Sequence, residues 1–142
     1  MDITTLAHTA PDCLAMLLNP ELLAVNQDPL VSGARVLRAA YSPDPPTSSD
    51  DVLYQVFGRV LAPAAASGGG GMLSRWAAAL VNRSPAPQNV TLLWAELGLV
   101  PTTAALVRDA GARADVGTFV GQWTTEVPAQ DAVLVVVSQP QP

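Results

Sequence analysis

Residues 118–137 read TFVGQWTTEVPAQDAVLVVV, and this stretch carries the strongest secondary-structure signal in the chain. Within residues 118–127, polar and apolar side chains alternate, which is typical of a strand with one buried face. The apolar residues of that face are Phe119, Trp123 and Val127. Residues 128–131 include the turn formers Pro and Asp, and the apolar run 132–137 predicts a strand buried on both faces. The stretch therefore predicts a β-hairpin.

Upstream of this hairpin, short apolar runs alternate with turn residues. Thirteen prolines and ten glycines divide the chain into pieces that are too short for long helices. A Pro-, Ser- and Asp-rich loop is expected over residues 42–51, and a flexible hairpin loop over residues 62–71, which read APAAASGGGG. Several short strands bounded by turns predict an antiparallel β-sandwich. The further predicted strands are residues 35–40, 52–61, 75–82, 90–94 and 104–108.

The first thirty residues have a helical pattern instead. Residues 9–12, Thr-Ala-Pro-Asp, combine a capping Thr with Pro in the first turn, which predicts a helix start. Asn19-Pro20 ends this helix, residues 21–24 form a further turn, and the Asn-Gln-Asp-Pro cluster at 26–29 is a strong turn signal. One face of the helix is apolar, and its residues are Leu14, Leu17 and Leu18.

Composition excludes several classes of function. The chain has 142 residues and a net charge of −5, with nine Asp and three Glu against seven Arg and no Lys. This balance provides no basic surface for nucleic acid or anionic membranes. No apolar run approaches the ~18 residues of a membrane span, and the N-terminal residues show no signal peptide. The chain is also shorter than a complete (β/α)8 barrel, which takes roughly 250 residues.

The Cys and His content limits metal and nucleophile chemistry. Because Cys13 is the only cysteine, the chain forms no internal disulfide, and a His-dependent catalytic triad would have to use His8. His8, Asp12 and Cys13 lie together at one helix start but lack a fourth ligand, so a zinc site is not expected. We therefore expect no metal site and no cofactor.

Residues 17–30 read LLNPELLAVNQDPL and resemble the melibiase-type α-galactosidases of glycoside hydrolase family twenty-seven. In that family, a stretch close to NKEVIAVNQDPLG lies in the helix after the last barrel strand. Val31 stands where the family has Gly. Further landmarks of the family follow in the same order: ALVNRS at 79–84, LWAELGL at 93–99, VRD at 107–109, GTF at 117–119 and VP at 127–128.

The resemblance implies a domain organisation and a fold class. Residues 1–33 would be the end of the catalytic barrel, comprising the tail of its last strand and its helix. Residues 34–142 would be a C-terminal antiparallel β-sandwich, so the fold is expected to be mainly β with a short helical remnant of a (β/α)8 barrel. Family members are mostly secreted, vacuolar or lysosomal, and this chain shows no targeting signal of its own.

The resemblance also implies that the catalytic residues are missing. Retaining hydrolysis needs two carboxylates roughly 5 Å apart. In the family, the nucleophile lies in a Y-x-K-x-D motif on a middle barrel strand, and the acid/base Asp lies two strands later, both upstream of the matched region. A chain without Lys contains no such motif. We therefore expect no catalytic residue in this chain, although the full-length parent would hydrolyse terminal α-galactosyl residues.

Three functional interpretations follow. The preferred one is a non-catalytic domain that packs against its own catalytic barrel, with the leucine face of the first helix as contact. An isolated copy would then expose this face as an apolar patch. The alternatives are a stand-alone β-sandwich that binds galactose-containing carbohydrate without hydrolysing it, and an incomplete gene model whose full product is the enzyme.

The other candidate site residues have plainer explanations. Asp50-Asp51 is expected to be a solvated loop pair, and Asp109 and Asp115 are expected to form turns. Gly68–Gly71 lacks the Lys of a phosphate-binding loop and reads as a loose loop. The tryptophans could stack on a sugar, but packing in the core or between domains is expected for all three of them: Trp76, Trp94 and Trp123.

Two sequons are present. Asn82-Arg83-Ser84 and Asn89-Val90-Thr91 both match the acceptor pattern for N-glycosylation. Pro85 follows the first sequon and should lower its use. Asn82 and Asn89 are therefore the candidate glycosylation sites, on the condition that the protein enters the secretory pathway.

Overall fold

The computed structural model describes residues 11–42, 51–66 and 71–141. Two short helices, α2 (Pro11–Leu17) and α3 (Pro20–Asn26), come first, and a 3-10 helix, η2 (Trp94–Leu97), follows the fourth strand. The strands are β1 (Arg35–Tyr41), β2 (Val52–Ala65), β3 (Met72–Asn82), β4 (Gln88–Leu93), β5 (Ala104–Asp109), β6 (Ala114–Val120), β7 (Gln122–Val127) and β8 (Ala132–Pro140).

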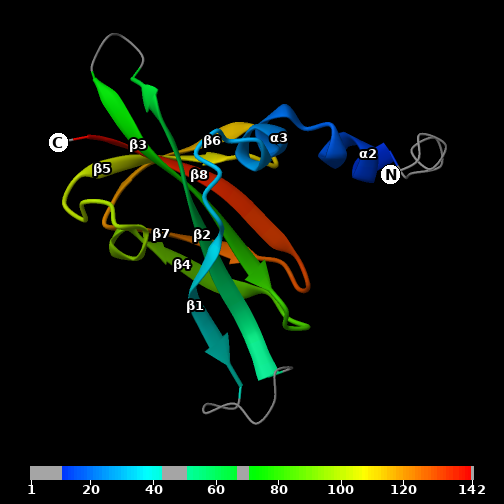
Figure 1. Ribbon diagram of the computed structural model, residues 1–142. Coiled ribbons are helices and arrows are strands. Elements are labelled where there is room, and N and C mark those ends of the chain that lie inside the picture. Colours follow the sequence, from blue (N-terminus) through cyan, green and yellow to red (C-terminus); the bar gives the residue numbers. More distant parts are fainter. Residues whose placement is uncertain (1–10, 43–50, 67–70, 142) are drawn as a thin grey trace.

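These strands form two antiparallel sheets (Figure 1). The large sheet has six strands in the order β1-β2-β3-β8-β5-β6, and the small sheet consists of β4 and β7. Buried side chains from both sheets share one hydrophobic core, so the sheets pack face to face. The prediction of a mainly antiparallel β-sandwich preceded by a short helical segment is confirmed.

The hairpin of β2 and β3 is longer than predicted. Its register pairs Val56 with Leu80, and both side chains point into the core. The sequence predicted a strand end at residue 61 and a loop over 62–71, but β2 continues to Ala65, which pairs with Met72. That part of the loop prediction is wrong, because alanine has a low β-propensity but accepts strand geometry where a partner strand supplies the hydrogen bonds. Residues 67–70 lie outside the described part.

The predicted hairpin over residues 118–137 has the wrong pairing. β6 ends at Val120, and Gly121 has a φ of 77°, which favours glycine and turns the chain out of the large sheet. β7 then pairs with β4, whereas β8 pairs with β3 and β5. The two halves of the predicted hairpin thus belong to different sheets, although the three apolar residues of its first half all pack in or against the core. The continuous apolar strand is confirmed, since Val133 to Ser138 are all buried or half-buried.

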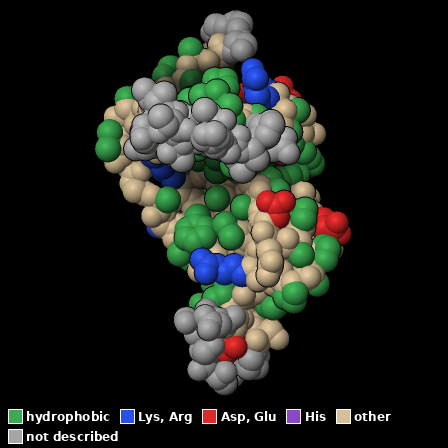
Figure 2. Space-filling view, turned by 90° about the vertical axis from the view of Figure 1, so that its right-hand side faces the viewer, with side chains coloured by type: hydrophobic (Ala, Val, Ile, Leu, Met, Phe, Trp, Pro, Cys, Tyr) green, Lys and Arg blue, Asp and Glu red, His purple; other side chains and the backbone are tan. Residues whose placement is uncertain are grey.

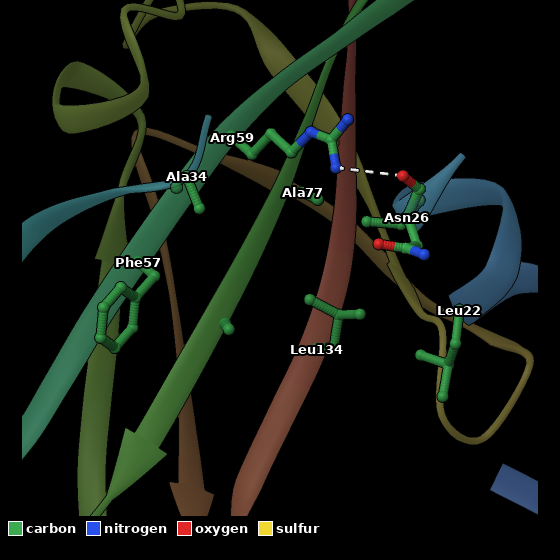
Figure 3. Close-up of a pocket in the computed structure, with 10 residues that line it drawn as sticks. Leu22, Asn26, Ala34, Phe57, Arg59, Ala77 and Leu134 are labelled. Atoms are coloured by element: carbon green, nitrogen blue, oxygen red, sulfur yellow. Dashed lines mark hydrogen bonds between the residues drawn. The ribbon is translucent and has the colours of Figure 1, made fainter. Parts of the chain in front are cut away.

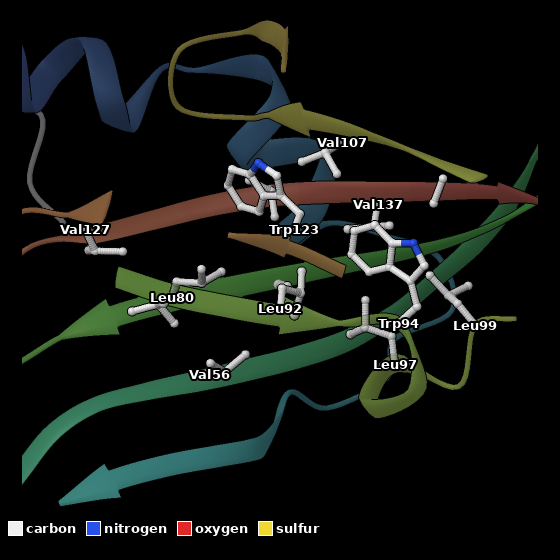
Figure 4. Close-up of a cluster of buried hydrophobic side chains, with 14 residues drawn as sticks. Val56, Leu80, Leu92, Trp94, Leu97, Leu99, Val107, Trp123, Val127 and Val137 are labelled. Carbon is white, nitrogen blue, oxygen red and sulfur yellow. The ribbon is translucent and has the colours of Figure 1, made fainter. Parts of the chain in front are cut away.

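The core is built around tryptophan and aliphatic side chains (Figure 4). Trp94 has no exposed surface, and its indole N–H donates to the carbonyl oxygen of Phe119 at 3.2 Å. Trp123 is buried beside it, and Trp76 is half-buried against the same cluster, with the guanidinium of Arg35 5.6 Å from its ring centre. The core positions that were expected for the three tryptophans are therefore observed.

An arginine links the two sheets at the β1 side of the sandwich. Arg38 Nη1 lies 3.1 Å from Glu96 Oε1, and its Nη2 donates to the carbonyl oxygen of Thr91. Arg38 comes from the large sheet, whereas Thr91 lies on β4 and Glu96 on η2. These contacts therefore join the β1 edge of the large sheet to β4 and η2.

Helix α3 covers part of the outer face of the large sheet (Figure 1). Leu22 and Val25 face Ala77, Ala79 and Leu134 across a shallow hollow. The helix therefore forms a third layer, outside the two sheets. In the part of the chain that the structure describes, no helix is both long and apolar enough to cross a bilayer.

Val31 has a strained backbone at the position where the resembling family has Gly. Its φ is 51°, in the left-handed region that β-branched residues rarely adopt, and its side chain is 81% exposed. We expect Val31→Gly to raise the free energy of unfolding by about 0.5–1 kcal/mol, because it relieves strain without losing packing. Chemical denaturation measures the change. Val36→Gly is the matched control, because Val36 is also exposed but lies in β1; it should destabilise the protein, and equal effects of the two substitutions would contradict the strain argument.

Candidate functional site

The segment that resembles the α-galactosidases is anchored to the sandwich by polar side chains. Asn19 is the N-cap of α3: its Oδ1 accepts hydrogen bonds from the backbone N–H groups of Glu21 and Leu22. Its Nδ2 donates to the carbonyl oxygens of Ala110 at 2.9 Å and Gly111 at 3.2 Å, in the turn between β5 and β6. Asn19 is thus buried at the junction, and it fixes the start of the helix to that turn.

Glu21 forms a second anchor in the first turn of α3. Arg108 Nε and Nη2 donate to the two carboxylate oxygens of Glu21 at 2.9 and 2.8 Å. Arg108 Nη1 also donates to Asp115 Oδ1 at 2.8 Å. The hydrogen bonds from Arg108 hold the pKa of Glu21 below its ordinary value, and those to Glu21 and Asp115 raise the pKa of Arg108.

Asp28 holds the far end of the segment. Its Oδ1 accepts from the backbone N–H of Leu30 at 3.0 Å and from that of Ala62 at 2.9 Å, so one buried carboxylate joins the turn after α3 to β2. Ser32 Oγ then donates to the carbonyl oxygen of Val60 at 2.7 Å. Contacts from residues 19, 21, 28 and 32 therefore hold the segment against the sandwich, and the domain boundary at residue 33 stays a prediction.

The Glu21 anchor predicts a pH dependence. Because the folded-state pKa of Glu21 is lowered, its contribution to stability is present above the ordinary carboxyl pKa and is lost as the pH falls through the lowered value. We expect Glu21→Gln to lower the melting temperature at pH 7, and the difference from the wild type to vanish in acid. Glu126→Gln, at an exposed carboxylate on β7, is the control and should show no such convergence. A difference that persists in acid would contradict the anchor.

Between and beyond these anchors, the segment exposes apolar side chains. We call them the apolar helical surface: Met16, Leu17, Leu18, Leu23, Leu30 and Val31. Met16 and Leu18 are 63% and 64% exposed. The exposure that was expected for Leu17 and Leu18 is observed, whereas Leu14 is half-buried. Figure 2 looks onto the molecule from the side on which α2 projects in Figure 1, and hydrophobic side chains are visible there together with several charged ones.

Beside this surface, α3 and the large sheet enclose a hollow with a volume of about 260 Å³ (Figure 3). Its floor is formed in part by Ala77 and Ala79, whose methyl groups leave the space above the sheet unfilled. Leu22, Phe57 and Leu134 stand around it, and Arg59 lies at its rim. The hollow is therefore an apolar depression with one cation at its edge.

Asn82 has a structural role that its sequon did not suggest. Its side chain is 1% exposed, and its Nδ2 donates to the carbonyl oxygens of Ala86, Val127 and Pro128. Its Oδ1 accepts from the backbone N–H and the hydroxyl of Ser84. Glycosylation at Asn82 stays a prediction, but a glycan on Nδ2 would be incompatible with this packing. Asn89 is exposed on β4 and stays a candidate acceptor.

Asp109 and Asp115, both expected to form turns, differ in their contacts. Asp109 Oδ1 accepts from the backbone N–H of Ala112 at 2.8 Å, which confirms its turn role. Asp115 instead lies in β6 and pairs with Arg108, so the turn role expected for it is wrong. The sequence could not reveal this pairing. An acidic residue beside a turn has the same sequence pattern whether it caps the turn or binds an arginine on a neighbouring strand.

The remaining candidates are only partly covered by the structure. His8 and Gly68–Gly70 fall outside the described part, as does Asp50, and the side chains of Asp12 and Cys13 are not described. Within the residues that are described, no cluster of three or more His, Cys, Asp or Glu side chains could hold a metal ion. Sugar binding by tryptophan stays a prediction, and no tryptophan in the described ranges has a freely exposed ring.

Sequence reasoning missed the anchoring role of several residues. Local signals existed for two of them: Asn19 precedes Pro20, a common N-cap arrangement, and Asp28 lies in a turn cluster. No local signal existed for the pair of Glu21 and Arg108, because 87 positions separate them.

Comparison with known proteins agrees with this geometry. Residues 64–137 match the family model described as the alpha galactosidase C-terminal beta sandwich domain. This match covers β3 to β7 completely and most of β8. No curated protein sequence matches the chain.

Solved structures of glycoside hydrolases share the fold. α-Galactosidase I from Mortierella vinacea aligns with a TM-score of 0.64 and 22% identity, covering 85% of this chain and 27% of its own. A GH27 β-L-arabinopyranosidase from Geobacillus stearothermophilus aligns with a TM-score of 0.65 and 20% identity, covering 96% and 25%. The α-galactosidase from Saccharomyces cerevisiae aligns with a TM-score of 0.62 and 14% identity, covering 85% and 36%. The chain thus spans between a quarter and about a third of these proteins.

Proposed function

Because the chain belongs to the family of α-galactosidase C-terminal β-sandwich domains, we propose that it is the non-catalytic C-terminal portion of an α-galactosidase-like glycoside hydrolase. In this role it packs against the catalytic barrel, and the barrel hydrolyses terminal α-galactosyl residues. The observation that carries the proposal is the apolar helical surface, which the sandwich itself leaves uncovered.

The arrangement of the helical segment supports docking. Asn19, Glu21 and Asp28 bind residues 19–28 to the sandwich, so the exposed Leu23 on α3 is held in a fixed position, and Leu18 directly precedes the first anchor. A soluble monomer rarely exposes such side chains together, and contiguous apolar patches mark contact surfaces. Rigid presentation also lowers the entropy that is lost on association.

The described carboxylates support a non-catalytic role. Glu21, Asp28, Asp109 and Asp115 are each engaged in hydrogen bonds to backbone N–H groups or to Arg108. A retaining glycosidase instead needs one carboxylate free to attack and one free to transfer a proton. These four carboxylates therefore serve the fold, which supports a non-catalytic role for the described part of the chain.

The docking surface predicts a dye-binding result. The isolated chain should bind 8-anilinonaphthalene-1-sulfonate and self-associate as its concentration rises, because the apolar helical surface lacks its partner. The variant Met16→Gln/Leu18→Gln/Leu23→Gln should roughly halve the dye fluorescence, since it replaces three exposed side chains with polar residues that favour helices.

A matched control separates this surface from general stickiness. Val100 and Val120 are also exposed, but they lie at the end of β5 and β6 opposite to the turn that contacts Asn19. Val100→Gln/Val120→Gln should leave dye binding and self-association unchanged. If both variants reduce them equally, or if neither does, the helical surface is not the docking surface.

A further inference from the structure

The hollow beside α3 has the shape of a receptor for one bulky apolar side chain. Its lining is mostly apolar, and its volume of about 260 Å³ lies between the helix and the sheet face and is open to solvent (Figure 3). The small side chains of Ala77 and Ala79 create the depth, whereas the larger Leu22, Phe57 and Leu134 form the sides. An empty apolar depression forfeits dispersion contacts that an inserted side chain would restore.

Arg59 at its rim forms no ion pair with a carboxylate in the described part of the chain. Its Nε is buried without a hydrogen-bond partner, and its Nη1 makes one long contact of 3.5 Å to the carbonyl oxygen of Asn26. None of the ion pairs among the described residues includes Arg59. A half-buried guanidinium gains most from a carboxylate, which can accept two parallel hydrogen bonds from it.

We propose that this hollow and Arg59 together form a docking site for a bulky apolar side chain with a neighbouring Asp or Glu carboxylate, carried by the catalytic barrel. The apolar group fills the space above Ala77 and Ala79, and the carboxylate pairs with Arg59.

The choice of a barrel residue rests on the proposed function and on two features of the chain. The hollow adjoins the helical segment, since Leu22 lines both this hollow and the groove beside Met16 and Leu18. The partner must also be acidic at this point, because Arg59 is a cation without a carboxylate among the described residues. Charge complementarity of this kind fixes the register of a docking surface.

Phenylacetate tests the site, because it joins an apolar ring to a carboxylate. NMR titration of the 142-residue chain should shift the methyl signals of Ala77, Ala79 and Leu134. Benzylamine, which has the same ring with a positive charge, should bind at least about tenfold more weakly, as expected for the loss of a charge-assisted hydrogen bond.

Arg59→Met should weaken phenylacetate binding by a similar factor. Arg75→Met is the matched control. Arg75 lies on β3 and is also outside the described ion pairs, but it does not line the hollow. The affinity for phenylacetate should be the same in this variant as in the wild type.

The outcomes separate this inference from the proposed function. No shift of the three methyl signals, or equal binding of phenylacetate and benzylamine, overturns the docking site even if Arg59→Met fails to fold. The domain role would survive that result, since it is carried by the apolar helical surface. Conversely, phenylacetate binding that depends on Arg59 would support the site even if the dye experiment located the contact surface elsewhere. That second result would contradict the barrel as the source of the carboxylate.

Discussion

Replacing Asn82 with alanine should lower the free energy of unfolding by about 3–4 kcal/mol and the melting temperature by roughly 10 °C. The side chain joins the turn after β3 to the end of β7, because its Nδ2 donates to the carbonyl oxygens of Ala86, Val127 and Pro128. Its Oδ1 meanwhile satisfies two donors of Ser84. Alanine leaves these buried groups without partners, and each unsatisfied group costs its full desolvation free energy.

Two further variants identify the cause. Asn82→Asp keeps the shape but turns the donor into an acceptor that faces three carbonyl oxygens, so it should destabilise the protein as well. Asn89→Ala removes an exposed asparagine from the other sequon and should change the stability by less than about 0.5 kcal/mol. Urea denaturation measures all three variants. A loss below about 1 kcal/mol for both Asn82 variants would contradict the assigned role.

Trp94→Ala should be comparably severe, with a loss of about 3–5 kcal/mol. Trp94 is completely buried among Leu92, Leu97 and Val137, and the indole leaves a large cavity when it is removed (Figure 4). Since a domain is stable by only about 5–15 kcal/mol, this variant should be unfolded or nearly so at 37 °C.

Trp94→Phe distinguishes packing from hydrogen bonding at the same position. Phenylalanine keeps most of the apolar contacts but lacks the N–H that donates to Phe119, so its loss should be well below that of alanine. Thermal unfolding followed by circular dichroism measures both variants. Equal losses would show that the hydrogen bond, and not the packing of the ring, dominates the contribution of this residue.

The sequence predicted individual strands better than their pairing. Alternation and apolar runs depend on the local burial of each face, and they located β1, β5 and β8 to within a few residues. Pairing depends on contacts between distant segments. Gly121 shows the difference: in the sequence it interrupts the alternating pattern of 118–127 only slightly, but its φ of 77° sends β6 and β7 into different sheets.

The candidate site was predicted in outline only. An apolar helical face is visible from the spacing of leucines, and its exposure follows once the sandwich is known. The anchors were not visible, because a pair such as Glu21 and Arg108 depends on how the turn between β5 and β6 meets α3. Asn82 was read as a sequon because the short motif is the same whether the asparagine faces solvent or the interior.

The family resemblance and the physical contacts concern the same residues. The NPELLAVNQDP segment supplies the cap, the ion pair and the buried carboxylate that bind α3 to the sandwich, at Asn19, Glu21 and Asp28. Of the apolar residues between these anchors, Leu22 and Val25 face the large sheet, whereas Leu23 is exposed. This arrangement is what the proposed role requires of a segment that joins the sandwich to a barrel.

The central claim is that this chain functions together with a catalytic barrel, and isolation of the native polypeptide tests it most directly. An antibody raised against the purified chain would capture the native polypeptide from the source cells. Mass spectrometry then gives the mass and peptide sequence of the captured polypeptide, and an aryl α-galactoside assay gives its activity. The account predicts a captured species that contains a barrel with a Y-x-K-x-D motif and hydrolyses the substrate, while the 142-residue chain alone does not. A captured species of 14.7 kDa without any barrel, or substrate turnover by the isolated chain, would contradict it.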